Sequence, residues 1–211
     1  MPPRAFVDSN VLASRTLRDW IFLLRNEVPG MYELWGSLDI VAEAIRVVRR
    51  QHPDAGGDIT AGLTELLHAN LNEVLTRYPA ARDFAGSDPD DQHVHAAAVA
   101  CGASYLITDN PSDFGDPDEL PYELYTADDF FCLVDDGAGS HVLEVTRKQA
   151  AYWQSRRAEG HTTKPLDVAL ADAGCSQFAA RVTNHLRVLA GPTAVPAGPP
   201  RAQRRQQQRR R

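Results

Sequence analysis

Residues 88–110, DPDDQHVHAAAVACGASYLITDN, place a helix directly before a buried strand. Asp88 is a good helix N-cap, Pro89 suits the first helical position, and Gly102 stands where the helix would end. The segment SYLIT, residues 104–108, has the apolar and β-branched character of a buried strand. A helix that leads straight into such a strand is typical of α/β proteins with a parallel sheet.

The same alternation extends to both sides of this stretch. Further strands are predicted at residues 5–7, in MYELWG (31–36) and in YELYT (122–126). Helices are predicted over residues 10–27, from residue 37 onward, over about 58–78, and over 127–136. We therefore expect an α/β sandwich in which helices flank a central parallel sheet.

The chain divides into three predicted parts. Residues 1–136 form the α/β domain, and the stretch DDGAGS (135–140) reads as a linker. Residues 137–190 read as a helical extension with no obvious strand. Residues 191–211 are rich in Pro, Gly, Gln and Arg, cannot bury a core, and are expected to form a disordered basic tail.

Composition points to an ordinary globular protein of the cytoplasm. Hydrophobic residues make up 43% of the chain and charged residues 24%. No apolar run reaches the roughly 18 residues of a membrane span, and the N-terminus lacks the apolar core of a signal peptide. The three cysteines are odd in number and widely spaced, which favours a reducing compartment over a disulfide framework or a zinc site.

The charge is unevenly distributed. The formal net charge is −6, and because the tail carries six arginines and no acids, residues 1–190 sum to −12. A nucleic-acid binder would usually present a basic face. An acidic body with a basic tail instead suits a protein that gathers carboxylates around a divalent cation.

Four acids fall where a parallel sheet would bring them together. Asp8 follows the first strand, Asp109 follows SYLIT, Asp91 lies in the first turn of a helix, and Glu43 borders a helix's apolar stripe. Each alone has an ordinary interpretation: a cap for Asp8, a helix-dipole partner for Asp91, a solvated residue for Glu43. Together they indicate an acidic pocket at the carboxyl edge of the sheet, where Mg²⁺ would relieve their repulsion.

Several segments resemble a PIN domain of the kind found in VapC-type toxin nucleases. The resemblance rests on FVDSNVL (6–12), DIVAEAI (39–45), the 88–110 stretch and SDF (112–114), and covers roughly residues 4–135. It implies a ribonuclease that depends on Mg²⁺ or Mn²⁺. Within it, Asp8, Glu43 and Asp91 would match the first three acids, with Asp8 and Asp91 as the principal metal ligands.

The fourth acidic position has three candidates in this sequence. The family often places an Asp or Asn two residues after the threonine, which is Asn110 here, and a further Asp before Phe, which is Asp113. Asp109 is displaced by one residue from that register. His95 lies four residues after Asp91 and could share its metal, although a solvated or RNA-facing role for this histidine is the main alternative.

The resemblance also implies a biological role and partners. It suggests the toxin of a type II toxin–antitoxin system, with an RNA substrate, a small antitoxin protein and a homodimer that the C-terminal helices could support. The alternatives are an orphan nuclease, a non-catalytic RNA-binding module on the same fold, and a HAD-like phosphatase. The phosphatase would need a second Asp at the position of Asn10.

Overall fold

The computed structural model describes residues 1–80 and 83–191, and the predicted basic tail from residue 192 onward lies outside this part. A five-stranded sheet forms the centre, and every pair of neighbouring strands is parallel. The strands, in the order β3-β2-β1-β4-β5 across the sheet, are β1 Arg4–Val7, β2 Glu33–Ser37, β3 Glu73–Leu75, β4 Tyr105–Ile107 and β5 Glu123–Tyr125. The predicted α/β class with a central parallel sheet is confirmed.

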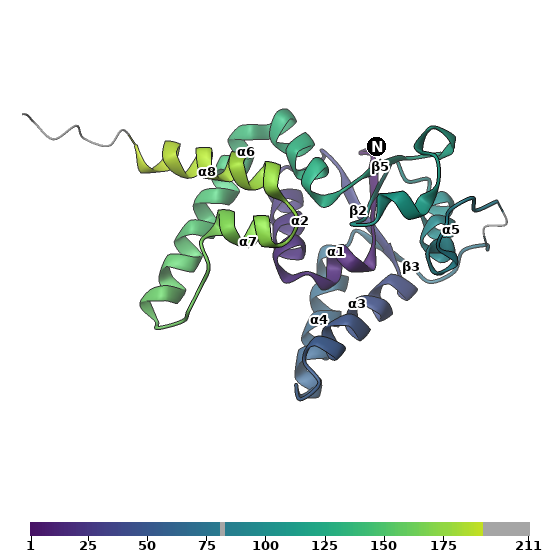
Figure 1. Ribbon diagram of the computed structural model, residues 1–211, viewed down its shortest axis with the longest axis horizontal. Coiled ribbons are helices and arrows are strands. Elements are labelled where there is room, and N and C mark those ends of the chain that lie inside the picture. Colours follow the sequence, from purple (N-terminus) through teal and green to yellow (C-terminus); the bar gives the residue numbers. More distant parts are fainter. Residues whose placement is uncertain (81–82, 192–211) are drawn as a thin grey trace, which may run out of the picture.

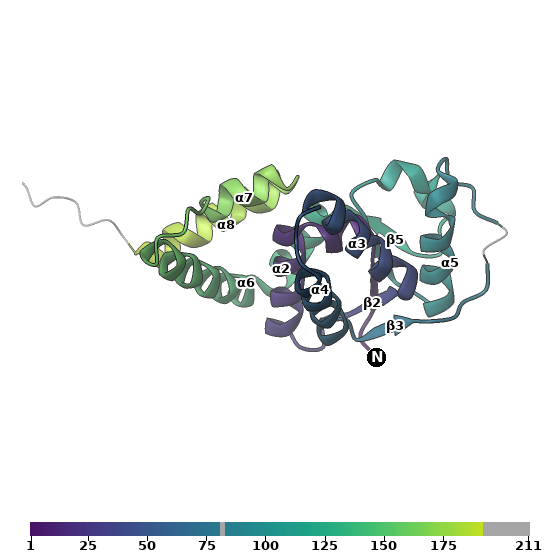
Figure 2. The same cartoon turned by 90° about the horizontal axis from the view of Figure 1, so that it is seen from below.

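Helices flank this sheet on both sides. In both views α5 lies on one side, while α2 and the C-terminal helices lie on the other (Figure 1, Figure 2). The helices are α1 Ser9–Ala13, α2 Arg15–Glu27, α3 Leu38–Gln51, α4 Gly57–Asn70, α5 Gln92–Cys101, α6 Ala127–Ala158, α7 Leu166–Asp172 and α8 Ser176–Ala190. Short 3₁₀ turns cover η1 Pro89–Asp91, η2 Pro111–Phe114 and η3 Pro117–Glu119.

The strand order reverses between β1 and β4, which are neighbours at the centre of the sheet. From β1 the chain moves outward to β2 and β3, then returns across the sheet through α5 to β4. Such a reversal leaves a crevice outside the carboxyl ends of the two central strands, where open α/β sheets bind their ligands. The residues that follow β1 and β4 therefore lie at the best-placed edge of the fold.

The third strand differs from the sequence prediction. A single helix over residues 58–78 is wrong, because α4 ends at Asn70 and β3 follows it as an edge strand beside β2. The side chain of Asn72 marks the turn, since its Oδ1 accepts a hydrogen bond of 2.9 Å from the backbone N–H of Leu34. Pairing with β2 thus outweighs the helical spacing of the apolar residues in this segment.

The predicted linker at residues 135–140 falls on a kink in α6. Two helical segments meet there, and Ala138 has non-helical backbone angles (φ −146°, ψ 40°). The helices on both sides of the break belong to the same hydrophobic core. Phe178 of α8 packs edge-on against Trp20 of α2, with ring centroids 5.1 Å apart, and also contacts Phe131 of α6 at 5.2 Å.

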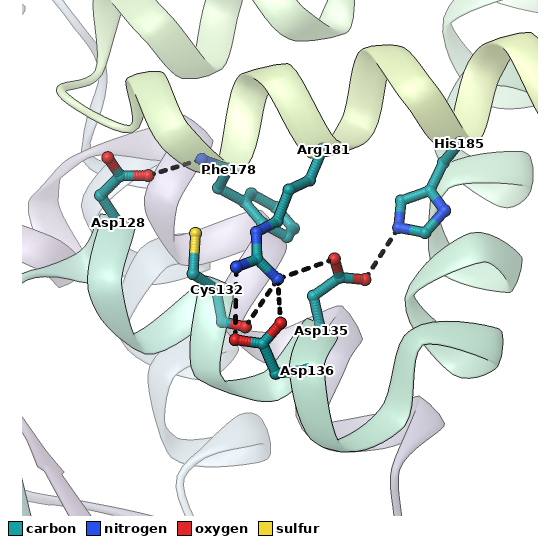
Figure 3. A network of polar contacts seen from close by, with 7 residues as sticks. All are labelled: Asp128, Cys132, Asp135, Asp136, Phe178, Arg181 and His185. Carbon is teal, nitrogen blue, oxygen red and sulfur yellow. Dashed lines mark hydrogen bonds and ion pairs between the residues drawn. The ribbon is translucent and has the colours of Figure 1, made fainter.

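A polar network joins α8 to the first half of α6 (Figure 3). The buried carboxylate of Asp128 accepts hydrogen bonds from the backbone N–H groups of Gln177 and Phe178 at 3.0 and 2.7 Å, and so caps the start of α8. Arg181 donates to Asp135 at 3.2 Å and also contacts Asp136, while His185 lies 2.8 Å from the other Asp135 oxygen. Side chains from α6 therefore fix both the start and the register of α8.

The three cysteines, Cys101, Cys132 and Cys175, are free and buried. They lie in α5, in the first half of α6 and just before α8. Across the described ranges, no helix combines the length and the apolar character needed to cross a membrane.

Because Asp128 caps the start of α8, we expect its removal to lower the thermal stability of the protein. Asp128→Ala removes the acceptor for two backbone N–H groups in a buried position, which costs about 1–2 kcal/mol of unfolding free energy. For a chain of this size, each kcal/mol lowers Tm by about 2–4 °C. The measurement is thermal unfolding followed by circular dichroism, with Asp54→Ala, which removes an exposed carboxylate elsewhere, as the matched control. Equal melting temperatures for the two variants would contradict the capping role.

Candidate metal centre

Asp8 stands at the carboxyl end of β1 and is held in one orientation. Its side chain is buried, with 4% of the residue surface exposed. Thr108, which follows β4, donates from Oγ1 to Asp8 Oδ2 at 2.7 Å, and the backbone N–H of Ser9 donates to the other oxygen. Thr108 Oγ1 in turn accepts from Asn10 Nδ2 at 3.1 Å and from the backbone N–H of Asn110 at 3.2 Å. This network ties the ends of the two central strands together.

The surroundings of Asp8 disfavour its bare negative charge. Burial raises the pKa of the Asp8 carboxyl, and the charge of Glu43 raises it further, against the opposing effect of the hydrogen bonds from Thr108 and Ser9. A carboxylate in this position gains from a nearby cation, because the cation offsets the cost of desolvation.

Three further acids lie close together beside this position. Carboxylate oxygens of Asp88, Asp91 and Asp113 lie within 4.8 Å of one another. Asp88 and Asp91 flank η1, and Asp113 belongs to η2, so two loops supply the group. The loops are clasped by a 2.9 Å hydrogen bond from the Ser87 N–H to the Asp113 carbonyl. At Gly86, any Cβ would lie 2.2 Å from that same carbonyl oxygen, so only glycine allows this approach.

Asp91 is the acid that links this group to Asp8. Its pKa is raised to about 6, first by burial and then by the negative charges of Asp8, Asp88 and Asp113, while His93 lowers it. Although Asp91 occupies the N-cap position of α5, its side chain accepts no capping hydrogen bond there. The Asp91 carboxylate is therefore available to a cation, in contrast to Asp88, which accepts from the Asp90 N–H at 2.9 Å.

Glu43 reaches the site from α3 and faces His93. The Nε2 atom of His93 lies 3.4 Å from Glu43 Oε1. Nδ1 of the same ring lies 2.7 Å from the carbonyl of Asp90, so in a neutral ring this nitrogen carries the proton. His95 is oriented differently, since it is buried and its Nδ1 contacts the Tyr122 hydroxyl at 2.8 Å. The contact with Tyr122 gives His95 a structural role, and a metal shared with Asp91 has no support.

The three candidates for the fourth position lie in different surroundings. Asp113 joins the acidic group of Asp91. Asp109 is at the surface beside a second pocket near the start of α6, although partial burial and the charge of Asp8 both raise its pKa. Asn110 is exposed, and its backbone N–H serves the Thr108 network. The structure thus brings Asp113 closest to Asp91, while Asp109 approaches the site from the side of Asp8.

A cleft of about 930 Å³ reaches the site at Glu43 and Asp91. Its walls come from α3, the segment after β3, and the start of α5, and they include Glu43 and Asp91. The sequence prediction did not place Asp88 in the acidic group, since it assigned this residue only to the helix cap that it also forms. Asp88 joins Asp91 and Asp113 because the two loops lie side by side, which spacing in the sequence does not reveal.

Comparison with protein-family models, with curated proteins and with solved structures found no match to this chain.

The donor set fits a hard divalent cation such as Mg²⁺ or Mn²⁺. All the convergent ligand atoms are carboxylate oxygens, which these ions prefer, and no cysteine contributes to the group. Burial and, after it, the negative charges of Asp8, Asp88 and Asp113 raise the pKa of Asp91, and a bound cation would offset both effects. Among the described residues, the acids whose oxygens converge are Asp88, Asp91 and Asp113, and Asp8 is near enough for its charge to raise the pKa of Asp91.

The pKa of Asp91 predicts a pH-dependent difference in stability. Because its folded pKa of about 6 exceeds the ordinary value, its contribution is most favourable below about pH 4 and is lost as pH rises through 6. Asp91→Asn removes the repulsion and loses no cap. Without metal, we expect this variant to match wild-type Tm near pH 4 and to exceed it at pH 7.

At pH 7 the expected gain in unfolding free energy of Asp91→Asn over wild type is modest. A shift of about two pKa units corresponds to roughly 3 kcal/mol, but Asp91 is half-exposed and screened, so we expect about 1 kcal/mol. The measurement is the Tm of both proteins in EDTA from pH 4 to pH 7.5. A difference that stays constant over this range would show that Asp91 does not titrate as described.

Proposed function

We propose that this protein is a divalent-metal-dependent endoribonuclease that hydrolyses RNA phosphodiester bonds. The observation that carries the proposal is the acidic group of Asp88, Asp91 and Asp113 beside the switch point of a parallel sheet. Asp8 is near enough to raise the pKa of Asp91, and Glu43 is near enough to raise that of Asp8. The resemblance of the sequence motifs to a PIN domain supports the same activity and the choice of RNA. The all-parallel sheet is compatible with that fold.

Each residue has a part that follows from its surroundings. Asp8 and Asp91 would hold Mg²⁺ or Mn²⁺, and Glu43 would add negative charge at the cleft wall. When bound, such an ion can activate a water molecule and offset the negative charge that develops on a phosphodiester. Thr108 keeps Asp8 in a fixed orientation through its 2.7 Å hydrogen bond, so the carboxylate needs little rearrangement on binding.

The biological role that we propose is that of the toxin in a type II toxin–antitoxin pair. It rests on the resemblance of the sequence motifs and includes a small antitoxin partner. A nuclease whose acids are already gathered in the folded chain would need an inhibitor to keep cellular RNA intact. A homodimer belongs to the same proposal.

Cleavage is tested with the two central acids. Asp8→Asn and Asp91→Asn should each reduce Mg²⁺- or Mn²⁺-dependent cleavage of a single-stranded RNA by about 100-fold or more, because each removes charge that the metal needs. The measurement is product formation on a labelled oligonucleotide, with Asp54→Asn as a control that changes an exposed acid outside the cleft.

Other outcomes point to the alternatives. RNA binding without any metal-dependent cleavage by the wild type would indicate a non-catalytic module. Hydrolysis of a phosphate monoester in place of RNA would indicate a phosphatase. Cleavage that is equal in wild type and in both Asn variants would reject the site assignment.

Toxicity is a separate prediction. Expression of the wild-type chain alone should arrest bacterial growth, because uncontrolled RNA cleavage stops protein synthesis, and Asp91→Asn should restore growth at an equal protein level. The measurement is colony formation after induction, with protein quantified by immunoblotting. An active nuclease that leaves growth unchanged would indicate an orphan enzyme rather than a toxin.

A further inference from the structure

Almost every arginine and lysine that the structure describes has a polar or aromatic partner. Arg181 pairs with two aspartates, Lys164 with Asp172, and Arg4 lies over the ring of Trp35. The remaining partnered cations are Arg15, Arg18, Arg25, Arg49, Arg147, Lys148, Arg156, Arg157 and Arg187. Most of the described arginine and lysine side chains thus have a hydrogen bond, an ion pair or a ring contact.

Within residues 1–80 and 83–191, the exceptions are Arg46, Arg50 and Arg77, which have no hydrogen bond, ion pair or ring contact. All three are exposed, and all three line the cleft that contains Glu43 and Asp91. Within the part of the chain that the structure describes, the unpaired cations thus all line the cleft that Glu43 and Asp91 also line. That coincidence indicates a binding surface rather than a generally charged exterior.

The local structure explains how the three arginines come to face one cleft. Arg46 and Arg50 lie four residues apart on α3, so they share a face and are separated by about 6 Å along its axis. Glu43 precedes Arg46 by three residues on the same face, so the row leads away from the acids. Arg77 lies opposite, after β3, in a segment that the hydroxyl of Tyr78 anchors by donating to Asp39 of α3.

The cleft presents both negative carboxylates and positive guanidinium groups, so its ligand should include both a cation and anionic groups. The acids favour a cation, whereas the free guanidinium groups favour anionic oxygens, to which arginine donates two parallel hydrogen bonds. A polyanion with a repeated phosphate can satisfy both, with one phosphate at the metal and its neighbours at the arginines. At about 930 Å³, the cleft is far larger than a single ion needs.

We propose that Arg46, Arg50 and Arg77 form a phosphate-binding track that holds the RNA phosphates flanking the scissile bond. This inference rests on the proposed ribonuclease function and deepens it. The arginines are positioning residues, since they lie beside the acids and carry no proton to or from the reacting atoms. They set affinity without reading base sequence.

The test compares two triple variants with the same change in charge. The cleft variant is Arg46→Gln, Arg50→Gln and Arg77→Gln combined. The control combines Arg147→Gln, Arg157→Gln and Arg187→Gln, which lie on α6 and α8, on the other side of α2 from α3 in both views (Figure 1, Figure 2). The probe is a 12-nucleotide single-stranded RNA, bound in EDTA over a range of salt concentrations and cleaved in Mg²⁺ or Mn²⁺.

The track predicts a change in salt dependence and in KM. Each phosphate contact on a single strand contributes about 0.7 to the slope of log affinity against log salt, so the cleft variant should lose about 2 units of slope. Its KM should rise by about 10-fold or more with kcat nearly unchanged, the pattern of lost uniform binding. The control variant should keep the wild-type slope and KM, and all three proteins should melt at the same temperature.

The outcomes separate this inference from the proposed function. If wild type cleaves RNA and the two triple variants behave alike, the track is wrong and the nuclease stands. If wild type binds RNA with a slope that only the cleft variant loses but never cleaves it, the track stands and the nuclease is wrong. A fall in kcat without a change in KM or slope would also overturn the positioning role.

Discussion

The hydrogen bond from Thr108 to Asp8 is the constraint on which the candidate site depends. It joins the residues that follow the two central strands, at the point where the strand order reverses, and it lies in the buried interior. A buried carboxylate would be costly if it were unsupported. Because β1 and β4 pair in a fixed register, Thr108 meets Asp8 and the acid is held at the floor of the crevice. The other acids then approach it on loops and helix starts.

Local sequence patterns such as helix caps predicted much of the secondary structure. They failed where contacts with a neighbouring strand or helix determine the secondary structure. Asp88, Pro89 and Gly102 mark the start and end of the α5 segment as expected, since caps and positive-φ positions are local properties. The strand β3 was missed because it is stabilised by its neighbour β2 and not by its own sequence pattern. Residues 135–140 read as a linker from their glycines, and a kink at Ala138 falls within them, while the helical segments on both sides pack in the same core.

The site residues also divide into those that the sequence predicts and those that depend on tertiary structure. Asp8 and Asp91 could be singled out because strand ends and a helix start place them at one edge of a parallel sheet. The choice between Asp109 and Asp113 could not be made from spacing, because it depends on the clasp of two loops at Gly86. Nor could sequence distinguish Arg46 and Arg50 from the many other arginines, since the distinction lies in which of them find partners after folding.

The three buried cysteines give the chain internal reporters of its own local opening. Burial raises the pKa of each thiol, to about 11 for Cys132, so very little reactive thiolate exists at neutral pH while the surrounding structure is closed. A thiol reagent would therefore modify each site only during transient opening of its own region. The order of labelling would compare the opening free energy of α5 at Cys101 with that of the packing between α6 and the start of α8, where Cys132 and Cys175 lie near each other, without any engineered probe.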